Sequence, residues 1–208
     1  VAAPNPVETL PQAAFVLRQP YFLLIIAASA LAQSSHAFAY AFASIYWKSL
    51  GIGDGTIGLL WAFSVFAEVV MFVVFRRFFR TMRPGMLLAI GTGIGVLRWL
   101  VFPAIWPAGF GLIGFFAVQG LHAFSFSLAF LGTQKMFTET VPEERMGAAQ
   151  GAAFFLYMVT LAIFTLISGP LYEAYGVSGF YVMAIVAAAG TALSLWALAY
   201  PQSSGSGG

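Results

Sequence analysis

Two histidines stand in stretches that are otherwise apolar, and both have the same neighbours. His36 lies in "QSSHAFAYAF" and His122 in "QGLHAFSFSL", so each follows a glutamine by three positions and precedes Ala-Phe. Histidine changes charge in the physiological pH range, and it also forms neutral hydrogen bonds across helix interfaces. The pair is therefore a candidate either for carrying protons or for holding helices together.

One glutamate and one arginine also lie inside apolar stretches, Glu68 and Arg98. A charge inside a membrane costs about 2.5–3.5 kcal/mol on insertion scales, so each needs a partner or water. Glu68 could take up and release a proton, or it could be a permanently paired structural carboxylate. Arg98 could contact an anionic group, pair with Glu68 or extend to the outer interface. Packing or pairing is the preferred role, and Gly91 and Gly95 before it allow another helix to approach closely.

The composition is that of a membrane protein. Of 208 residues, 61% are hydrophobic and 8% charged, against about 45–50% and about 25% in soluble domains. The nine basic residues form no basic face, so nucleic acid is not an expected partner. The chain has no cysteine, no metal-ligand spacing and no nucleophile triad, so we expect no enzyme activity, cofactor or metal.

Six apolar stretches are long enough to cross a bilayer as helices, which takes roughly 20 residues each. Continuous apolar runs of this length favour helices over barrel strands, so the predicted class is an all-α membrane protein. The predicted spans are Tyr21 to Trp47, Thr56 to Phe75, Met86 to Ile105, Phe110 to Met136, Gly147 to Ser168 and Gly179 to Tyr200.

The basic residues of the loops predict the orientation. Those on the side of the N-terminus are Arg18, Arg76, Arg77, Arg80, Arg83, Lys135 and Arg145, whereas the opposite side has Lys48 alone. Cytoplasmic loops carry the excess of basic residues, so both termini are expected in the cytoplasm.

The two histidine motifs extend into a weak internal repeat of three spans. Shifting the second span and the loop after it onto the fifth superposes Gly58 on Gly151 and "RRFFRTMRPG" on "GPLYEAYGVS". Because three is odd, two such units have opposite orientations in the membrane. Inverted pairs of three-helix units are a transporter architecture whose sites lie near the middle of the membrane.

Four segments carry a family resemblance: "SIYWKSLGIGDGTIGLLWAFSVFAEVVMF" with the arginine loop after it, "VPEERMGAAQG" and "SGPLYEAYG". From Arg18 to Tyr200 the chain resembles the C-terminal half of a major facilitator superfamily transporter, in the branch of phenylpropionate permeases and nucleoside-proton symporters. The resemblance implies alternating access, and a bacterial inner membrane is the expected location. Such transporters have twelve helices, so the chain is expected either to be half of a longer polypeptide or to pair with a second copy.

We expect residues 1–19 to be a cytoplasmic linker, residues 20–201 the bundle, and residues 202–208 a Gly/Ser linker added for expression. The absent initial Met and the proline-rich start favour the half of a longer polypeptide. The expected partners are lipid, an N-terminal six-helix half or a second copy, a small organic solute and a proton.

The resemblance places the first helix of each three-helix unit along the central cavity. On these helices hydrogen-bonding and aromatic groups share one face, which suits a small solute with a polar end and an aromatic or sugar-like body. The predicted solute and proton pathway is Gln33, His36, Tyr40, Glu68, Gln119 and His122.

The expected function is that of half a secondary transporter, coupled to protons through Glu68, for an aromatic carboxylate or a nucleoside-like solute. The alternative is a membrane scaffold or an isolated half that moves nothing.

Overall fold

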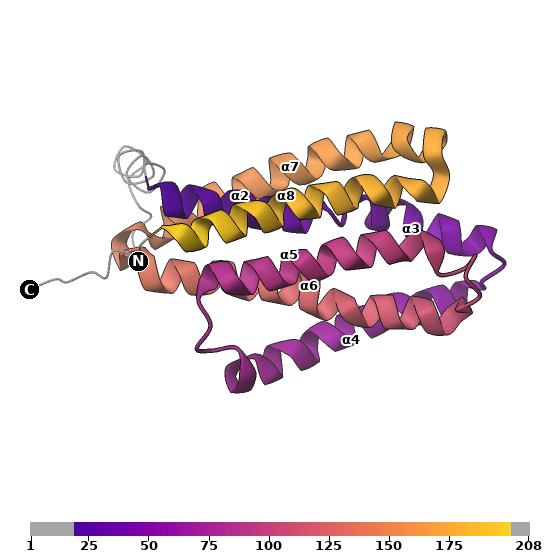
Figure 1. The fold of residues 1–208 in the computed structure, drawn as a ribbon, viewed down its shortest axis with the longest axis horizontal. Helices are drawn as coiled ribbons and strands as arrows, with labels where there is room; N and C mark the ends of the chain where they lie inside the picture. The colour runs from indigo at the N-terminus through magenta and orange to yellow at the C-terminus, as the bar shows by residue number, and fades with distance from the viewer. Residues whose placement is uncertain (1–18, 201–208) are drawn as a thin grey trace, which may run out of the picture.

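A computed structural model describes residues 19–200 of the chain, which form helices joined by short turns (Figure 1). The α-helices are α2 (Pro20–Ser34), α3 (Ala37–Ser49), α4 (Asp54–Phe78), α5 (Pro84–Val101), α6 (Gly111–Thr140), α7 (Met146–Tyr175) and α8 (Phe180–Ala199). Three short 3₁₀ helices are η1 (Phe102–Ala104), η2 (Glu143–Arg145) and η3 (Gly176–Gly179). The predicted all-α class is confirmed. Apart from Gln19, the predicted linker lies outside the described residues, as does the whole Gly/Ser tail.

The helices have the length and composition of membrane spans. Within the described range, five helical stretches qualify: Pro20–Ser49, Asp54–Phe78, Pro84–Ala104, Gly111–Thr140 and Glu143–Ala199. The last contains both α7 and α8, and the chain reverses direction at η3 between them (Figure 1). Helices satisfy their own backbone hydrogen bonds, which lipid cannot do. The chain is therefore an integral membrane protein, whereas the count of six spans stays a prediction.

The first predicted span, Tyr21 to Trp47, is not one continuous helix. It breaks between α2 and α3 at Ser35 and His36, where the amide of His36 donates to the carbonyl of Gln33 at 3.2 Å. The carbonyl of Ala32 instead accepts a hydrogen bond from Ser35 Oγ at 2.7 Å and a second one from His36 Nδ1 at 3.0 Å. These side chains compete with the helical backbone bonds, which explains the break.

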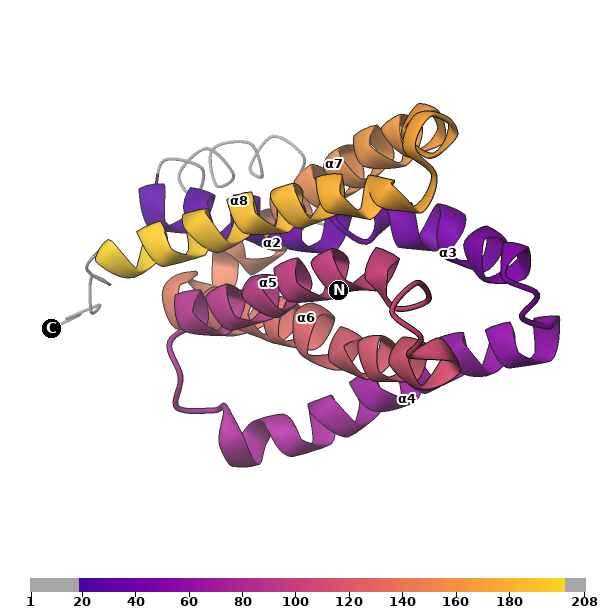
Figure 2. The ribbon, with the colours of Figure 1, turned by 45° about the vertical axis from the view of Figure 1, so that its right-hand side comes forward.

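The packing of the helices has an internal symmetry. The first helical region, α2 with α3, packs against α7 and α8, and α6 packs against α4 and α5. Helix α5 also packs against α8, in the middle of the molecule (Figures 1 and 2). If α2 with α3 is exchanged with α6, α4 with α7, and α5 with α8, the same set of pairings results. This is the pattern expected for two equivalent three-helix units.

Helices α5 and α6 are in close contact at Gly91. A Cβ atom there would lie 3.0 Å from the backbone nitrogen of Ala129, closer than side chains normally pack. Gly93, on another face of the same helix, has no atom within 4 Å of its Cβ position. Small residues permit such contacts in membranes, and this one seats the C-terminal part of α5, with Arg98, against α6.

Candidate functional site

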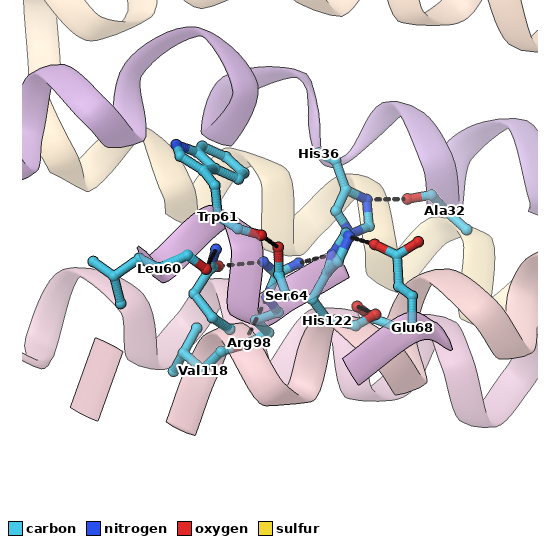
Figure 3. A network of polar contacts seen from close by, with 11 residues as sticks. Ala32, His36, Leu60, Trp61, Ser64, Glu68, Arg98, Val118 and His122 are labelled. Carbon is cyan, nitrogen blue, oxygen red and sulfur yellow. Dashed lines mark hydrogen bonds and ion pairs between the residues drawn. The ribbon is translucent and has the colours of Figure 1, made fainter. Parts of the chain in front are cut away.

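Polar side chains from four helical regions meet inside the bundle (Figure 3). His36 comes from the α2–α3 break, Glu68 from α4 and Arg98 from α5. Gln119 and His122 are three residues apart on α6, so they share one face of that helix. The structure therefore brings together five of the residues that the sequence singled out separately.

Arg98 is buried, and its guanidinium group is bound entirely to α6. Its Nε donates to the carbonyl of Val118 at 3.1 Å, and its Nη2 donates to Gln119 Oε1 at 2.9 Å. Its Nη1 lies 2.9 Å from Nδ1 of His122. The Gln119 amide is held in turn, because its Nε2 donates to the carbonyl of Leu60 on α4 at 3.2 Å. Arg98 thus ties α5 to α6, and Gln119 ties α6 to α4.

The Arg98 contact determines where the proton of His122 resides. A guanidinium group has only donors, so Nδ1 of His122 must accept, and a neutral imidazole then carries its hydrogen on Nε2. This Nε2 lies 2.7 Å from Oε1 of Glu68. A neutral histidine therefore connects a buried cation to a carboxylate; we call Arg98, His122 and Glu68 the Arg–His–Glu chain. The sequence allowed a direct Arg98–Glu68 pair, and the structure inserts His122 between them.

Glu68 is the accessible end of the Arg–His–Glu chain. It lies on the buried stripe of α4, between Ser64 and Met71, which follow the three- and four-residue spacing of a packed helix face. Its side chain is 16% exposed, against 5% for that of His122. Glu68 is therefore the most exposed of the three groups.

His36 lies beside the Arg–His–Glu chain and forms no hydrogen bond with Arg98, His122 or Glu68 in the described structure. Its ring centroid is 5.0 Å from that of His122, with the rings edge to face, and 5.0 Å from that of Trp99. Its Nδ1 donates to the Ala32 carbonyl, so its Nε2 carries the lone pair. This buried Nε2 has no partner among the described residues. His36 thus has an acceptor atom without a partner next to the Arg–His–Glu chain.

Trp99 is a site residue that the sequence reasoning missed. Its indole Nε1 donates to Ser35 Oγ at 3.1 Å, which ties α5 to the α2–α3 break. The signal was available, because a buried indole requires an acceptor and Trp99 follows the intramembrane Arg98 directly. Trp61, whose indole donates to Ser44 Oγ at 2.9 Å, joins α4 to α3 in the same way.

The remaining predicted pathway residues, Tyr40 and Gln33, lie on either side of His36. The ring of Tyr40 stacks on that of His36 at 5.9 Å between centroids, and the residue is 47% exposed. Gln33 is buried, and its Oε1 has no hydrogen-bond partner among the residues that the structure describes. Within the described residues, neither Tyr40 nor Gln33 forms a hydrogen bond with the Arg–His–Glu chain.

A cleft of about 740 Å³ lies between α2, α6 and α7 and includes Gln33; we call it the α2–α6–α7 cleft. Its volume is in the range of small-molecule sites. None of its lining residues is charged. They are Ile26, Ser29, Ala30, Gln33, Phe126, Phe130, Thr133, Gln134, Phe137, Gly147, Gln150, Gly151, Ala153, Phe154 and Tyr157. Sequence reasoning named no pathway residue on α7, although Gln150 is a polar residue in an apolar stretch.

Phe126 connects the cleft to the charged groups. It lines the cleft, and its ring centroid lies 5.3 Å from that of His122 and 6.2 Å from that of His36. The apolar cleft and the Arg–His–Glu chain are therefore neighbouring parts of one region, separated by an aromatic ring.

The predicted arginine loop lies away from this region, at the α4–α5 connection. Arg76 and Arg77 are in the last turn of α4, and Arg83 precedes α5 and donates to the carbonyl of Leu198 at 3.4 Å. The carbonyl of Arg80 accepts a hydrogen bond from Lys135. Between residues 19 and 200 the structure contains no group of three metal-ligating side chains.

Comparisons with known proteins agree with the architecture. The sequence model described as "MFS_1 like family" matches residues 7–183. The chain is also 32% identical, over 164 residues, to the "Probable 3-phenylpropionic acid transporter" of Escherichia coli (strain K12). That match covers 78% of this chain and 42% of the relative, so the chain spans less than half of the relative's length. No solved structure is a significant match. The chain therefore belongs to the MFS_1 like family of the major facilitator superfamily.

Proposed function

We propose that the chain is part of a secondary transporter that carries a small organic anion together with a proton by alternating access. The Arg–His–Glu chain is the observation that carries this proposal. It places a protonatable carboxylate at the exposed end of a buried, charge-balanced network. The relative named as a 3-phenylpropionic acid transporter supports an aromatic carboxylate as the solute.

Charge balance gives the physical reason for coupling. With Glu68 ionised, the charges of Arg98 and Glu68 cancel through the neutral His122. A proton on Glu68 leaves the buried cation of Arg98 uncompensated, and an unbalanced charge in a membrane is costly. A solute carboxylate near the Arg–His–Glu chain then balances the charge of Arg98. The proton and the anion therefore bind together more favourably than either binds alone. A nucleoside-like solute, the other sequence-based expectation, supplies no such charge.

The same network gives the proton a mechanical effect. His122 donates a hydrogen bond to the ionised carboxylate of Glu68. Hydrogen bonds to a charged acceptor are about twice as strong as those between neutral groups. Protonating Glu68 weakens the link between α4 and α6, while Arg98 continues to hold α5 on α6. The proton thereby loosens α4 from α6 at Glu68, and Gln119 still joins the two helices through the carbonyl of Leu60.

A complete carrier on this proposal contains a second six-helix half facing this one. The match to only 42% of the relative supports a second half within one polypeptide over pairing with a second copy. The loop arginines support cytoplasmic termini in an inner membrane.

The test is uptake of labelled 3-phenylpropionate into proteoliposomes that hold the complete carrier, with wild type compared against Glu68→Gln. Glutamine imitates the protonated carboxyl but cannot release a proton. We expect wild type to accumulate the solute when the outside is acidic and the variant to lose at least tenfold of this accumulation. Exchange of internal for external solute, which requires no release of the proton, should persist in the variant.

Two results would contradict the proposal. One is accumulation in Glu68→Gln equal to that of wild type. The other is wild-type uptake that ignores the pH gradient. Glu139→Gln is the matched control, because Glu139 is an exposed glutamate that pairs with Lys135 at 3.3 Å, and it should behave as wild type.

A further inference from the structure

The α2–α6–α7 cleft has a chemistry that the Arg–His–Glu chain lacks. Its aromatic side chains come from α6 and α7, and they are Phe126, Phe130, Phe137, Phe154 and Tyr157. Its polar side chains are all uncharged, and they are Ser29, Gln33, Thr133, Gln134 and Gln150. Such a surface suits an aromatic ring with an uncharged polar substituent and gives no cation to bind a carboxylate.

The carboxylate of a solute therefore belongs at the other side of Phe126, near the charged groups. The buried guanidinium of Arg98 lies there, bound to His122 and Gln119. A solute whose carboxylate approaches the Arg–His–Glu chain extends its ring past Phe126 into the cleft. This orientation follows from where charge is present and where it is absent.

Gln33 is a buried polar group of the cleft whose amide oxygen has no partner among the described residues. It is 7% exposed, and its Oε1 has no hydrogen bond to any residue of the described range. One residue further on, Ser34 Oγ donates to Thr160 Oγ1 at 2.9 Å and ties α2 to α7 beside the cleft. A buried amide without a partner costs free energy unless a ligand supplies the missing hydrogen bond.

Resting on the proposed transport function, we infer that the cleft binds the ring of the solute and that Gln33 selects rings bearing a hydroxyl group. A hydroxyl can donate to the amide oxygen, which is the atom of Gln33 that lacks a partner. The substrate class is thus hydroxylated arylalkanoic acids rather than the unsubstituted acid. A site with a buried hydrogen-bonding group discriminates against analogues that lack the matching group.

The test measures competition against uptake of labelled 3-phenylpropionate by the complete carrier in proteoliposomes. The competitors are unlabelled 3-phenylpropionate, its ring-hydroxylated isomers, and the corresponding methoxy compounds, which accept but do not donate hydrogen bonds. We expect at least one hydroxylated isomer to inhibit about fivefold more strongly than the unsubstituted acid, as one net hydrogen bond provides. The methoxy compounds should show no such gain.

Gln33→Met keeps the length of the side chain and removes its hydrogen-bonding groups, so it should abolish the preference. Gln150→Met is the matched control, because Gln150 lines the same cleft but is exposed, and it should keep the preference. Each preference is a ratio measured within one variant, so it does not depend on the amount of folded protein.

Several outcomes overturn the inference. Equal inhibition by all compounds in wild type would do so, as would a preference that survives Gln33→Met or disappears in Gln150→Met. If wild type takes up 3-phenylpropionate but shows no hydroxyl preference, only the assignment of the cleft fails. If wild type transports none of these acids, the proposed function fails and the inference falls with it.

Discussion

At the residue scale, the central feature is a histidine whose two nitrogens have different partners. His122 accepts from Arg98 on one side of its ring and donates to Glu68 on the other. Taking up a second proton would place N–H groups of both residues opposite each other at the Arg98 contact. His122 therefore stays neutral while Arg98 is bound, and Glu68 is the better site for the transported proton.

Substituting His122 separates its structural role from a role in proton transfer. We predict that His122→Gln retains most of the thermal stability, because an amide can still accept from Arg98 and donate to Glu68. His122→Leu removes the link between Arg98 and Glu68, so the two charges are no longer connected, and it should cost about 3–5 kcal/mol. Thermal unfolding of both purified variants provides the measurement. If the two variants have equal melting temperatures, His122 does not hold the charged groups together.

Activity of the same variants completes the test. On our account Glu68 carries the proton, so His122→Gln should keep pH-driven accumulation within about tenfold of wild type, the size of one hydrogen bond to a charged group. Complete loss of coupling in a folded His122→Gln variant would instead make the histidine itself a proton carrier.

The sequence singled out the residues that the structure brings together at this scale, but not their pairing. Charged and titratable side chains in apolar stretches require partners, which is enough to select Glu68, Arg98 and the histidines. Whether Arg98 meets Glu68 directly depends on the rotation and depth of α5 relative to α6. Packing of Gly91 against Ala129 sets both, and the glycine spacing predicted a close contact there but not its partner.

At the scale of elements, the α5–α6 contact positions the Arg–His–Glu chain. We predict that Gly91→Val destabilises the protein by about 1–3 kcal/mol, the usual cost of inserting methyl groups into a packed interface. The obstacle is the backbone nitrogen of Ala129, which cannot rotate away as a side chain would. Uptake should fall as well, since separating α5 from α6 lengthens the hydrogen bonds of Arg98.

Gly93→Val provides the matched control for this prediction. It introduces the same side chain into the same helix, where no atom lies within 4 Å of the Cβ position. Thermal unfolding in detergent measures both variants. The packing account is wrong if Gly93→Val is as destabilising as Gly91→Val.

The break between α2 and α3 is an element that hydropathy could not predict. The stretch from Pro20 to Ser49 is apolar throughout, so its composition predicts one helix. The break arises from the bonds of Ser35 and His36 to the Ala32 carbonyl and from the Trp99 indole on Ser35. The last of these is a contact between helices, which lies outside the reach of a local pattern.

At the scale of the whole molecule, the helix pairings agree with the three-helix repeat, which itself stays a prediction. The all-α class was predictable from length and hydropathy. The α2–α6–α7 cleft was not, because its residues come from three helices and are mostly ordinary aromatic and small side chains.

The orientation of the molecule is a separate prediction at this scale. The chain contains no cysteine, so single cysteines can be introduced without a background signal. We expect a cysteine at Arg77 to react with a membrane-impermeant maleimide only in inside-out vesicles. A cysteine at Gly53, at the opposite end of α4, should react only in right-side-out vesicles. The reverse pattern would place the termini outside the cytoplasm.

The central claim is that proton and solute cross together through this molecule. The most direct measurement records proton uptake by proteoliposomes, with a pH electrode, when 3-phenylpropionate is added outside. Our account predicts about one proton per solute molecule in wild type, since one ionised carboxylate replaces another beside Arg98. The same account predicts no proton uptake by proteoliposomes that hold Glu68→Gln when the solute is added outside. Solute entry without proton movement in wild type, or unchanged proton uptake in the variant, would contradict it.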